Sequence, residues 1–182
     1  MRASSIIAAL LLSLSVGAWA EEPLSILGYT SAASFWAEMP KGWQSDTAAA
    51  KKIGAIFVLL PKTYTFNSAP IVIVASAYHN TTVENAMSQD SASFVADDPA
   101  IHISSVRRVV AKKGAQFTVR QFRSEKLKQQ GYESVAYHQE GPDVVVLTLS
   151  AQFEPALNNG IPIFDEMLAT FESSKIKVKV EQ

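Results

Sequence analysis

The sequence predicts an α+β fold, in which helices cover a central and mainly antiparallel β-sheet. Residues 53–60 and 71–78 form two apolar runs rich in β-branched side chains, a pattern typical of buried strands. Residues 101–150 alternate apolar and polar side chains around two short turns, a pattern typical of antiparallel hairpins. Two further segments, one on each side of this region, carry apolar residues at helical spacing. Together these elements predict an αβα sandwich.

The composition fits one globular domain. The chain has 182 residues, with 16 basic and 17 acidic side chains, and 48% of the residues are hydrophobic. These values exclude a strongly disordered or collagen-like chain. Because the chain contains no cysteine, disulfide frameworks, thiolate nucleophiles, cysteine-ligated zinc and iron–sulfur clusters are excluded.

Residues 1–20 have the pattern of a secretory signal peptide. A positive charge near the start is followed by an apolar centre at residues 6–14 and by the small-residue motif Ala18-Trp19-Ala20. We expect cleavage before Glu21 and a single domain over residues 21–182. The apolar run is shorter than the roughly twenty residues that a membrane-spanning helix needs. We therefore expect no transmembrane anchor after cleavage, and a bacterial protein that is periplasmic or secreted.

Two main helices are expected against the sheet. Thr81 and Glu84 have the spacing of a capping box, and the helix that follows them is expected to end at Asp97-Asp98-Pro99. The second helix is expected to begin near Asn159-Gly160, with Pro162 in its first turn, where a missing amide hydrogen costs no hydrogen bond. The buried stripe of the first helix is predicted to contain Val83, Ala86, Met87, Phe94 and Val95.

Two hairpins are expected between these helices. The first pairs residues 103–110 with residues 116–122 around Lys112-Lys113-Gly114, where glycine is free to take a positive φ. The second pairs residues 133–139 with residues 144–149. After the second helix, residues 175–180 alternate lysine with apolar side chains, which predicts an exposed edge strand.

The sequence lacks the local motifs of common catalytic sites. No two of the eight glycines lie closer than ten residues, so the glycine-rich phosphate loops and the GxSxG motif are absent. His79, His102 and His138 are at least 23 residues apart, so no local metal-ligand pair occurs. We therefore predict no catalytic residues, no metal and no cofactor, and a protein that is not an enzyme. A catalytic site assembled from residues far apart in the chain stays open.

One region of the chain is strongly basic. Residues 101–131 carry eight basic side chains against a single acidic one, Glu125. With the turn at residues 112–114, a symmetric register pairs Val109 with Phe117 and places Arg108 and Arg120 together on the solvent face. Two guanidinium groups there repel each other unless an anion or a carboxylate lies between them. The candidate partner-binding residues are Arg107, Arg108, Lys112, Lys113, Arg120 and Arg123.

Two interpretations of this basic region are open. It could form a docking surface for an anionic partner, either an envelope protein or an anionic surface of lipid headgroups or glycan. It could instead be a solvated hairpin face whose charge is balanced by the acidic remainder of the same chain. Nucleic acid is not expected as a partner, because the protein is expected to be exported and its pI of about 6.3 is well below the value typical of nucleic-acid-binding domains.

Four segments resemble the PsbP-like superfamily, which includes the exported bacterial DcrB-type proteins and shares its fold with a small Ran-binding nuclear protein. The resemblance is carried by Met39-Pro40-Lys41-Gly42-Trp43, by the apolar segments 56–60 and 71–77, and by residues 163–174. It implies an αβα sandwich and a non-enzymatic accessory or docking role, and it provides no catalytic residues. The main hypothesis is therefore an exported accessory protein that binds an anionic partner through the basic hairpin. The alternative is a carrier of a small apolar ligand, held between the second helix and the sheet; the oligomeric state stays open.

Overall fold

The computed structural model describes residues 23–31, 33–127 and 131–174. The expected signal peptide and the expected edge strand at residues 175–180 lie outside the described residues. The described helices are α1 (Thr47–Ile53), α2 (Val83–Asp97) and α3 (Glu154–Thr170). None of these helices is long and apolar enough to cross a membrane.

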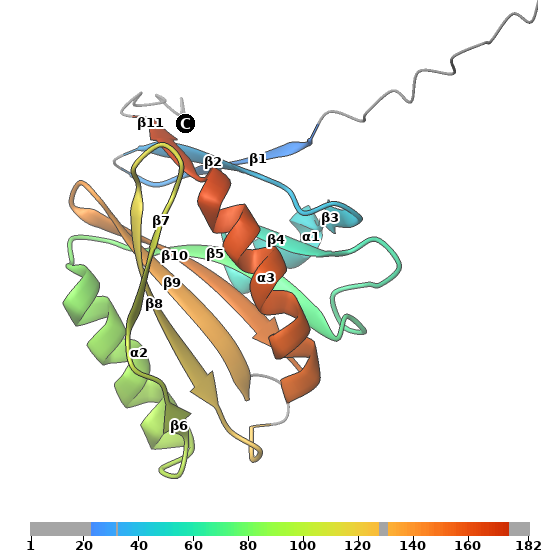
Figure 1. The fold of residues 1–182 in the computed structure, drawn as a ribbon, viewed down its shortest axis with the longest axis vertical. Helices are drawn as coiled ribbons and strands as arrows, with labels where there is room; N and C mark the ends of the chain where they lie inside the picture. Colours follow the sequence, from blue (N-terminus) through green and yellow to red (C-terminus); the bar gives the residue numbers. More distant parts are fainter. Residues whose placement is uncertain (1–22, 32, 128–130, 175–182) are drawn as a thin grey trace, which may run out of the picture.

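A large antiparallel sheet of eight strands forms the centre of the fold (Figure 1). Its strand order is β3-β4-β5-β10-β9-β8-β6, and β7 also pairs with β8. The strands are β3 (Trp43–Ser45), β4 (Phe57–Pro61), β5 (Ile71–Tyr78), β6 (His102–Ile103), β7 (Arg107–Val110), β8 (Gln116–Arg123), β9 (Tyr132–Glu140) and β10 (Asp143–Ala151).

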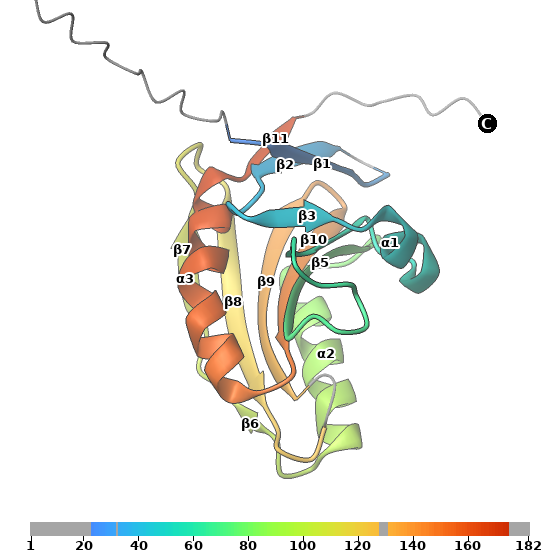
Figure 2. The same ribbon diagram turned by 90° about the vertical axis from the view of Figure 1, so that its right-hand side faces the viewer.

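A second, three-stranded sheet lies across one end of the molecule. It consists of β1 (Ser25–Tyr29), β2 (Ser34–Glu38) and β11 (Glu172–Ser174), in the order β1-β2-β11. Figure 2 shows α3 on one face of the large sheet, and α1 and α2 on the other. The prediction of an α+β sandwich with a mainly antiparallel sheet is confirmed, whereas the sequence analysis did not predict the small sheet.

The face under α3 is a filled apolar core. Phe164 and Leu168 of α3 are fully buried against Leu147 and Leu149 of β10. The helix comes so close to the sheet at Gly160 that an added Cβ would lie 2.1 Å from Ile71 Cδ1. The space between α3 and the sheet, where an apolar ligand was expected in the alternative hypothesis, is thus occupied by the protein's own side chains.

The predicted start of α3 was wrong. The helix begins at Glu154, five residues before Asn159, and Pro162 lies inside it. The Asn159-Gly160 pair has the sequence of a turn, but the close packing of Gly160 on the sheet selects glycine for its lack of a side chain.

The predicted cap of α2 was wrong by one residue. Thr82, not Thr81, is the N-cap, and its hydroxyl accepts a hydrogen bond from Asn85 N at 3.3 Å. Thr81 is held by the β9–β10 hairpin, because its N–H donates to Pro142 O and its carbonyl accepts from Gln139 Nε2. The predicted apolar stripe packs on the sheet through Ala86 and Met87, whereas Val95 is exposed.

Helix α1 also shifts one predicted strand boundary. Ile53 ends α1, and Gly54 follows it with φ 70°, a left-handed conformation that stops the helix. The predicted strand at residues 53–60 therefore begins only at Phe57. Asp46 is the N-cap of α1, and its carboxylate accepts a hydrogen bond from Ala49 N at 2.9 Å.

Both predicted hairpins are confirmed, but the first strand of the first hairpin, predicted over residues 103–110, is interrupted at residues 104–106 and divides into β6 and β7. In the first, Val109 pairs with Phe117, as the symmetric register predicts, and Gly114 has φ 91°. In the second, Asp143 pairs with Glu140, and Gly141 has φ 61°. Because successive strand residues point to opposite faces, this register decides which basic residues of β7 and β8 share a side of the sheet.

Candidate functional site

The basic hairpin divides into two sets of arginines on opposite faces. Arg107 and Arg123 lie on the α3 side, where they meet acidic residues of that helix. Arg107 Nη2 donates to Asp165 Oδ1 at 2.6 Å, and Arg123 donates to Glu154 Oε1 and to Asn158 Oδ1. These two predicted partner-binding residues are therefore engaged within the protein.

Two lysines occupy the tip of the same hairpin, beside the C-terminal end of α3. Lys112 N donates to Ala169 O at 2.9 Å, and Lys113 Nζ lies 3.6 Å from Glu172 Oε1. Helix α3 has no basic residue in its last turn. The two lysines thus supply positive charge where the helix dipole is negative, although both side chains stay exposed.

Arg108 and Arg120 lie on the α2 side and line a shared cleft. The cleft has a volume of about 470 Å³ and lies between α2 and the β7–β8 hairpin. Arg108 pairs with Thr118 in the register, so Arg120 is its diagonal neighbour, within reach of the same bound group. From α2, Glu84, Met87, Ser88 and Ser91 complete the wall.

Arg120 is half-buried rather than solvent-facing, which corrects the expectation for this residue. Its Nη1 donates to Ser91 Oγ at 2.9 Å, and Ser91 Oγ in turn donates to Met87 O at 2.6 Å. Its Nε is buried and has no hydrogen-bond partner among the described residues. Helix α2 covers this face, and the sequence prediction of the hairpin did not include a helix above it. Arg108 is exposed, as expected.

A larger groove opens on the same face of the sheet, at the other side of α2. It has a volume of about 740 Å³ and lies between α2 on one side and, on the other, α1 together with the loop that joins β4 and β5. Its floor is formed by one face of β5, β10 and β9, and it includes Val74, Thr148 and Glu133. Asp90 and Phe94 of α2 form one wall.

Two carboxylates line this groove. Asp90 accepts hydrogen bonds from the hydroxyl groups of Tyr78 and Tyr137, at 2.6 Å from the latter. Glu133 is only 8% exposed, and Ser150, its partner in the β9–β10 register, hydrogen-bonds to it. Burial, together with the nearby charge of Asp90, raises the pKa of Glu133 to about 7 despite the Ser150 hydrogen bond.

The two tyrosines stay protonated over the physiological range. Burial and the hydrogen bond to Asp90 raise the pKa of both Tyr78 and Tyr137 well above the usual range. Their hydroxyl groups therefore act as fixed donors to the Asp90 carboxylate and tie α2 to β5 and β9.

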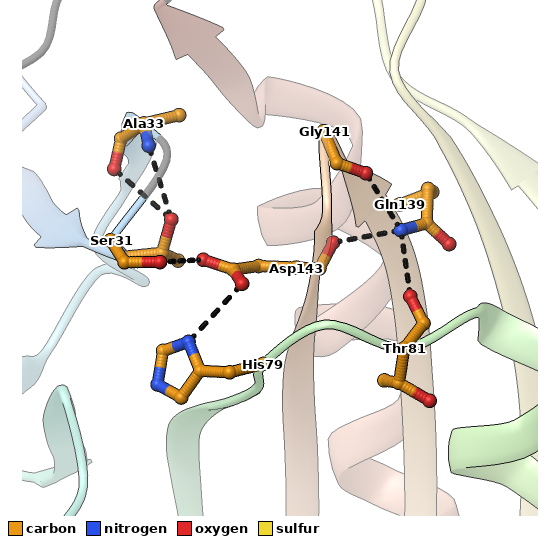
Figure 3. Close-up of polar contacts among 8 residues, drawn as sticks. Ser31, Ala33, His79, Thr81, Gln139, Gly141 and Asp143 are labelled. Atoms are coloured by element: carbon orange, nitrogen blue, oxygen red, sulfur yellow. Dashed lines mark hydrogen bonds and ion pairs between the residues drawn. The ribbon is translucent and has the colours of Figure 1, made fainter.

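A separate cluster of polar residues around Asp143 joins three turns at one end of the sheet (Figure 3). Ser31 Oγ donates to Asp143 Oδ2 at 2.6 Å, and His79 Nδ1 lies 3.2 Å from Asp143 Oδ1. Burial favours the neutral carboxyl, but hydrogen bonds from Ser31, His79 and the Asn80 backbone outweigh it and hold the pKa of Asp143 below its usual range. Beside it, Gln139 Nε2 donates to the carbonyls of Thr81, Gly141 and Asp143.

This cluster contains the residue types of a hydrolase, but their contacts differ from those of a catalytic triad. Within the described part of the chain, the Ser31 hydroxyl bonds to the carboxylate and not to the imidazole. Nucleophile activation requires a base at the hydroxyl, and a carboxylate with a lowered pKa is a weak base. The geometry instead explains how Asp143 holds the β1–β2 turn and the β5–α2 turn together.

The other candidates from the sequence lie in structural positions. His138 is buried between Phe117 and Phe171, and its Nδ1 lies 2.9 Å from Gln116 O. Asp98 ends α2 as predicted and accepts from Ala100 N and Ser124 Oγ. Among the described residues, no three histidine, aspartate or glutamate side chains are grouped as metal ligands.

Asp90 and Glu133 were not predicted from the sequence as site residues. The sequence contains one indication for Glu133. It shares a strand face with Val135 and Tyr137, so a charged side chain lies on a face that otherwise carries residues typical of a core. Asp90 gave no such signal, because a single carboxylate on an amphipathic helix ordinarily faces water.

Comparisons with known proteins show similarity of fold. No protein-family model matches the sequence, and no curated protein matches it. The solution structure of cyanobacterial PsbP (CyanoP) from Synechocystis sp. PCC 6803 is similar with a TM-score of 0.56 and 11% identity, over 88% of this chain and 98% of that one. A structure from Bacteroides thetaiotaomicron has a TM-score of 0.40 and 13% identity, over 77% of this chain and 45% of that one. A protein of unknown function from Pseudomonas aeruginosa has a TM-score of 0.39 and 13% identity, over 80% of this chain and 94% of that one.

Only the first of these similarities is strong enough to bear on the fold. It agrees with the layers and the antiparallel sheet described above, and at this identity it says nothing about function. The chain has the PsbP-like fold.

Proposed function

We propose that this protein is an exported, non-enzymatic accessory protein that docks an acidic segment of a partner protein in the cleft between α2 and the β7–β8 hairpin. The observation that carries the proposal is the pair Arg108 and Arg120. Both line one cleft, and the buried Nε of Arg120 has no partner among the described residues. A buried donor without an acceptor costs free energy, and a bound carboxylate would satisfy it.

The surroundings of the two arginines support this proposal. In the described part of the chain, no carboxylate oxygen lies within 4.0 Å of either guanidinium group, in contrast to Arg107 and Arg123. Residues of the first turns of α2 border the cleft, so the positive end of the helix dipole adds to the attraction for an anion. Glu84 lies in the same wall, and it restricts the position that a partner carboxylate can take.

The cleft also favours a protein segment over a flat anionic surface. Arg120 is half-buried and fixed by Ser91, so only a chain that enters the cleft can reach its guanidinium group. A planar guanidinium group binds a carboxylate in a bidentate manner. Export, and the finer relationship to DcrB-type proteins, belong to the same proposal and depend on residues 1–20 and on the sequence resemblance.

The proposal can be tested with a fluorescent glutamate-rich peptide as the probe. We expect the intact wild-type protein to bind it, with an affinity that falls between 50 and 200 mM salt, as expected for an electrostatic contact. R108E should weaken binding at least about tenfold. R120K keeps the charge but loses the planar fork, and it should also weaken binding.

K52E is the matched control, because it makes the same charge change at an exposed lysine of α1, away from the cleft. Equal loss of binding in R108E and K52E would show that only net charge matters, and would contradict the proposal. Binding of the wild-type protein to phosphatidylglycerol vesicles, with no binding to the peptide, would replace the acidic segment with a membrane surface.

A further inference from the structure

The groove between α1 and α2 combines apolar walls with an acidic end. Val72 and Val74 of β5 lie along its floor. The walls include Ile53 of α1, Phe66 of the β4–β5 loop and Phe94 of α2. Asp90 and Glu133 line the same groove. A volume of about 740 Å³ lies within the range of small-molecule sites.

In the part of the chain that the structure describes, no basic side chain lies within ion-pair distance (4.0 Å) of Asp90 or Glu133. Among the described residues that line the groove there is no lysine, arginine or histidine. Glu133 is 8% exposed, and Ser150 is the described side chain that hydrogen-bonds to its carboxylate. The two carboxylate oxygens can therefore accept further donors. Asp90 accepts one hydroxyl on each oxygen, and each carboxylate oxygen can accept a second donor.

The effect of burial on Glu133 agrees with this geometry. Burial raises the pKa of Glu133 to about 7, the direction expected for a buried carboxyl group with no cation beside it. A bound cation would reverse this shift and keep Glu133 ionised. An anion would be repelled by both carboxylates.

We propose that this groove binds an amphiphilic organic cation, with its ammonium group at Glu133 and Asp90 and its hydrocarbon part on the valines and aromatic rings. The charge complementarity selects the cation, because an ammonium group donates three hydrogen bonds and the acidic end offers only acceptors. The apolar walls select the hydrocarbon part, because moving methylene groups out of water into contact with apolar side chains is favourable. The site is separate from the arginine cleft, which lies on the other side of α2.

The experiment uses the intact protein at pH 8 and titrates it with n-decylamine, n-decanol, decanoate and calcium chloride, followed by calorimetry. We expect the amine to bind at least about tenfold more tightly than the alcohol, because it adds a charge-assisted hydrogen bond. We expect decanoate and calcium to give no binding. E133Q should weaken the amine at least about tenfold, whereas E166Q, an exposed carboxylate on α3, should bind it as the wild-type protein does.

Several outcomes would overturn the proposal. Equal affinities for amine and alcohol would show an apolar site without charge recognition. Unchanged amine binding in E133Q would remove the acidic end from the site, and binding of calcium in place of the amine would make it a metal site. Amide NMR shifts in the wild-type protein provide a measurement that does not depend on the variant: they should centre on Ser76, Thr148 and Glu133, and shifts centred on the β7–β8 hairpin would contradict the assignment.

Discussion

The two faces of the large sheet are built from the same strands but are covered differently. On the α3 face, Ile71, Ile73 and Ala75 of β5 are buried in a continuous core. On the other face, Val72, Val74 and Ser76 of the same strand are only half-buried, because α1 and α2 leave a groove between them. Among the described residues, the largest buried apolar cluster lies on the α3 face, whereas two smaller clusters, the groove and the arginine cleft lie on the other face.

The same division explains the basic hairpin. Odd-numbered Arg107 and Arg123 point to the α3 face, where Asp165 and Glu154 neutralise them. Even-numbered Arg108 and Arg120 point to the α2 face, where no acidic residue pairs with them within the described part of the chain. A run of charge in the sequence therefore divides between two surfaces of the fold, and among the described residues only the arginines on the α3 side form ion pairs with carboxylates.

The largest expected change is a loss of stability caused by a substitution in the core under α3. F164A removes a fully buried ring and should lower the free energy of unfolding by about 3–5 kcal/mol, since it leaves a cavity in a closed core. V74A on the open face should lower it by only about 1 kcal/mol, since Val74 borders a groove. Urea unfolding of both variants measures the difference. Similar losses would contradict the contrast between the faces.

The second largest expected effect is the dependence of stability on pH that Glu133 causes. In the folded protein burial raises its pKa to about 7, whereas the unfolded chain releases the proton near the ordinary value of 4.5. Between these values the folded state holds more protons, so stability should fall as the pH rises, by roughly 3 kcal/mol between pH 4 and pH 8. E133Q should lack this decrease and be more stable than the wild-type protein at pH 8.

The control for this prediction is E166Q, in which an exposed carboxylate is changed. Its stability should follow the wild-type dependence on pH. Parallel curves for the wild-type protein and E133Q in urea unfolding at several pH values would show that Glu133 is not the titrating group.

The smallest effect concerns the neutralised arginines. The Arg107 and Asp165 side chains are 37% and 36% exposed, so their ion pair should contribute less than about 1 kcal/mol in a double-mutant cycle of R107A and D165A. R108A, which loses no ion pair, should change stability by less than about 0.5 kcal/mol. A large cost for R108A would indicate a structural role and weaken the proposed cleft.

Much of the fold could be predicted from local patterns. The strand register around Lys112-Lys113-Gly114 follows from side-chain alternation and turn length, and it is confirmed by the pairing of Val109 with Phe117. The errors arose where distant contacts decide local structure. Gly160 has the sequence of a turn but lies inside α3, because Ile71 occupies the space next to it.

The sites were less predictable than the fold. The alternation of side chains along the strands is enough to place Arg107 and Arg123 on one face and Arg108 and Arg120 on the other. It does not predict which of the two faces α2 covers. The meeting of Asp90 with Tyr78 and Tyr137 joins residues up to 47 positions apart, and no local pattern predicts such a contact. Hollows between helices depend on how far each helix lies from its neighbour, which the sequence of either helix alone does not specify.

The central claim is that Arg120, whose Nε–H has no acceptor among the described residues, binds an anion in the cleft between α2 and the β7–β8 hairpin. The NMR signal of the Arg120 Nε–H group tests this claim directly. We would follow the arginine Nε–H signals of the intact protein by ¹⁵N NMR while adding the glutamate-rich peptide at low salt. The account predicts that the Arg120 signal moves downfield to saturation, as the buried N–H gains an acceptor, whereas the Arg123 signal stays in place. An unchanged Arg120 signal at saturating peptide, or a shift confined to Arg107 and Arg123, would contradict it.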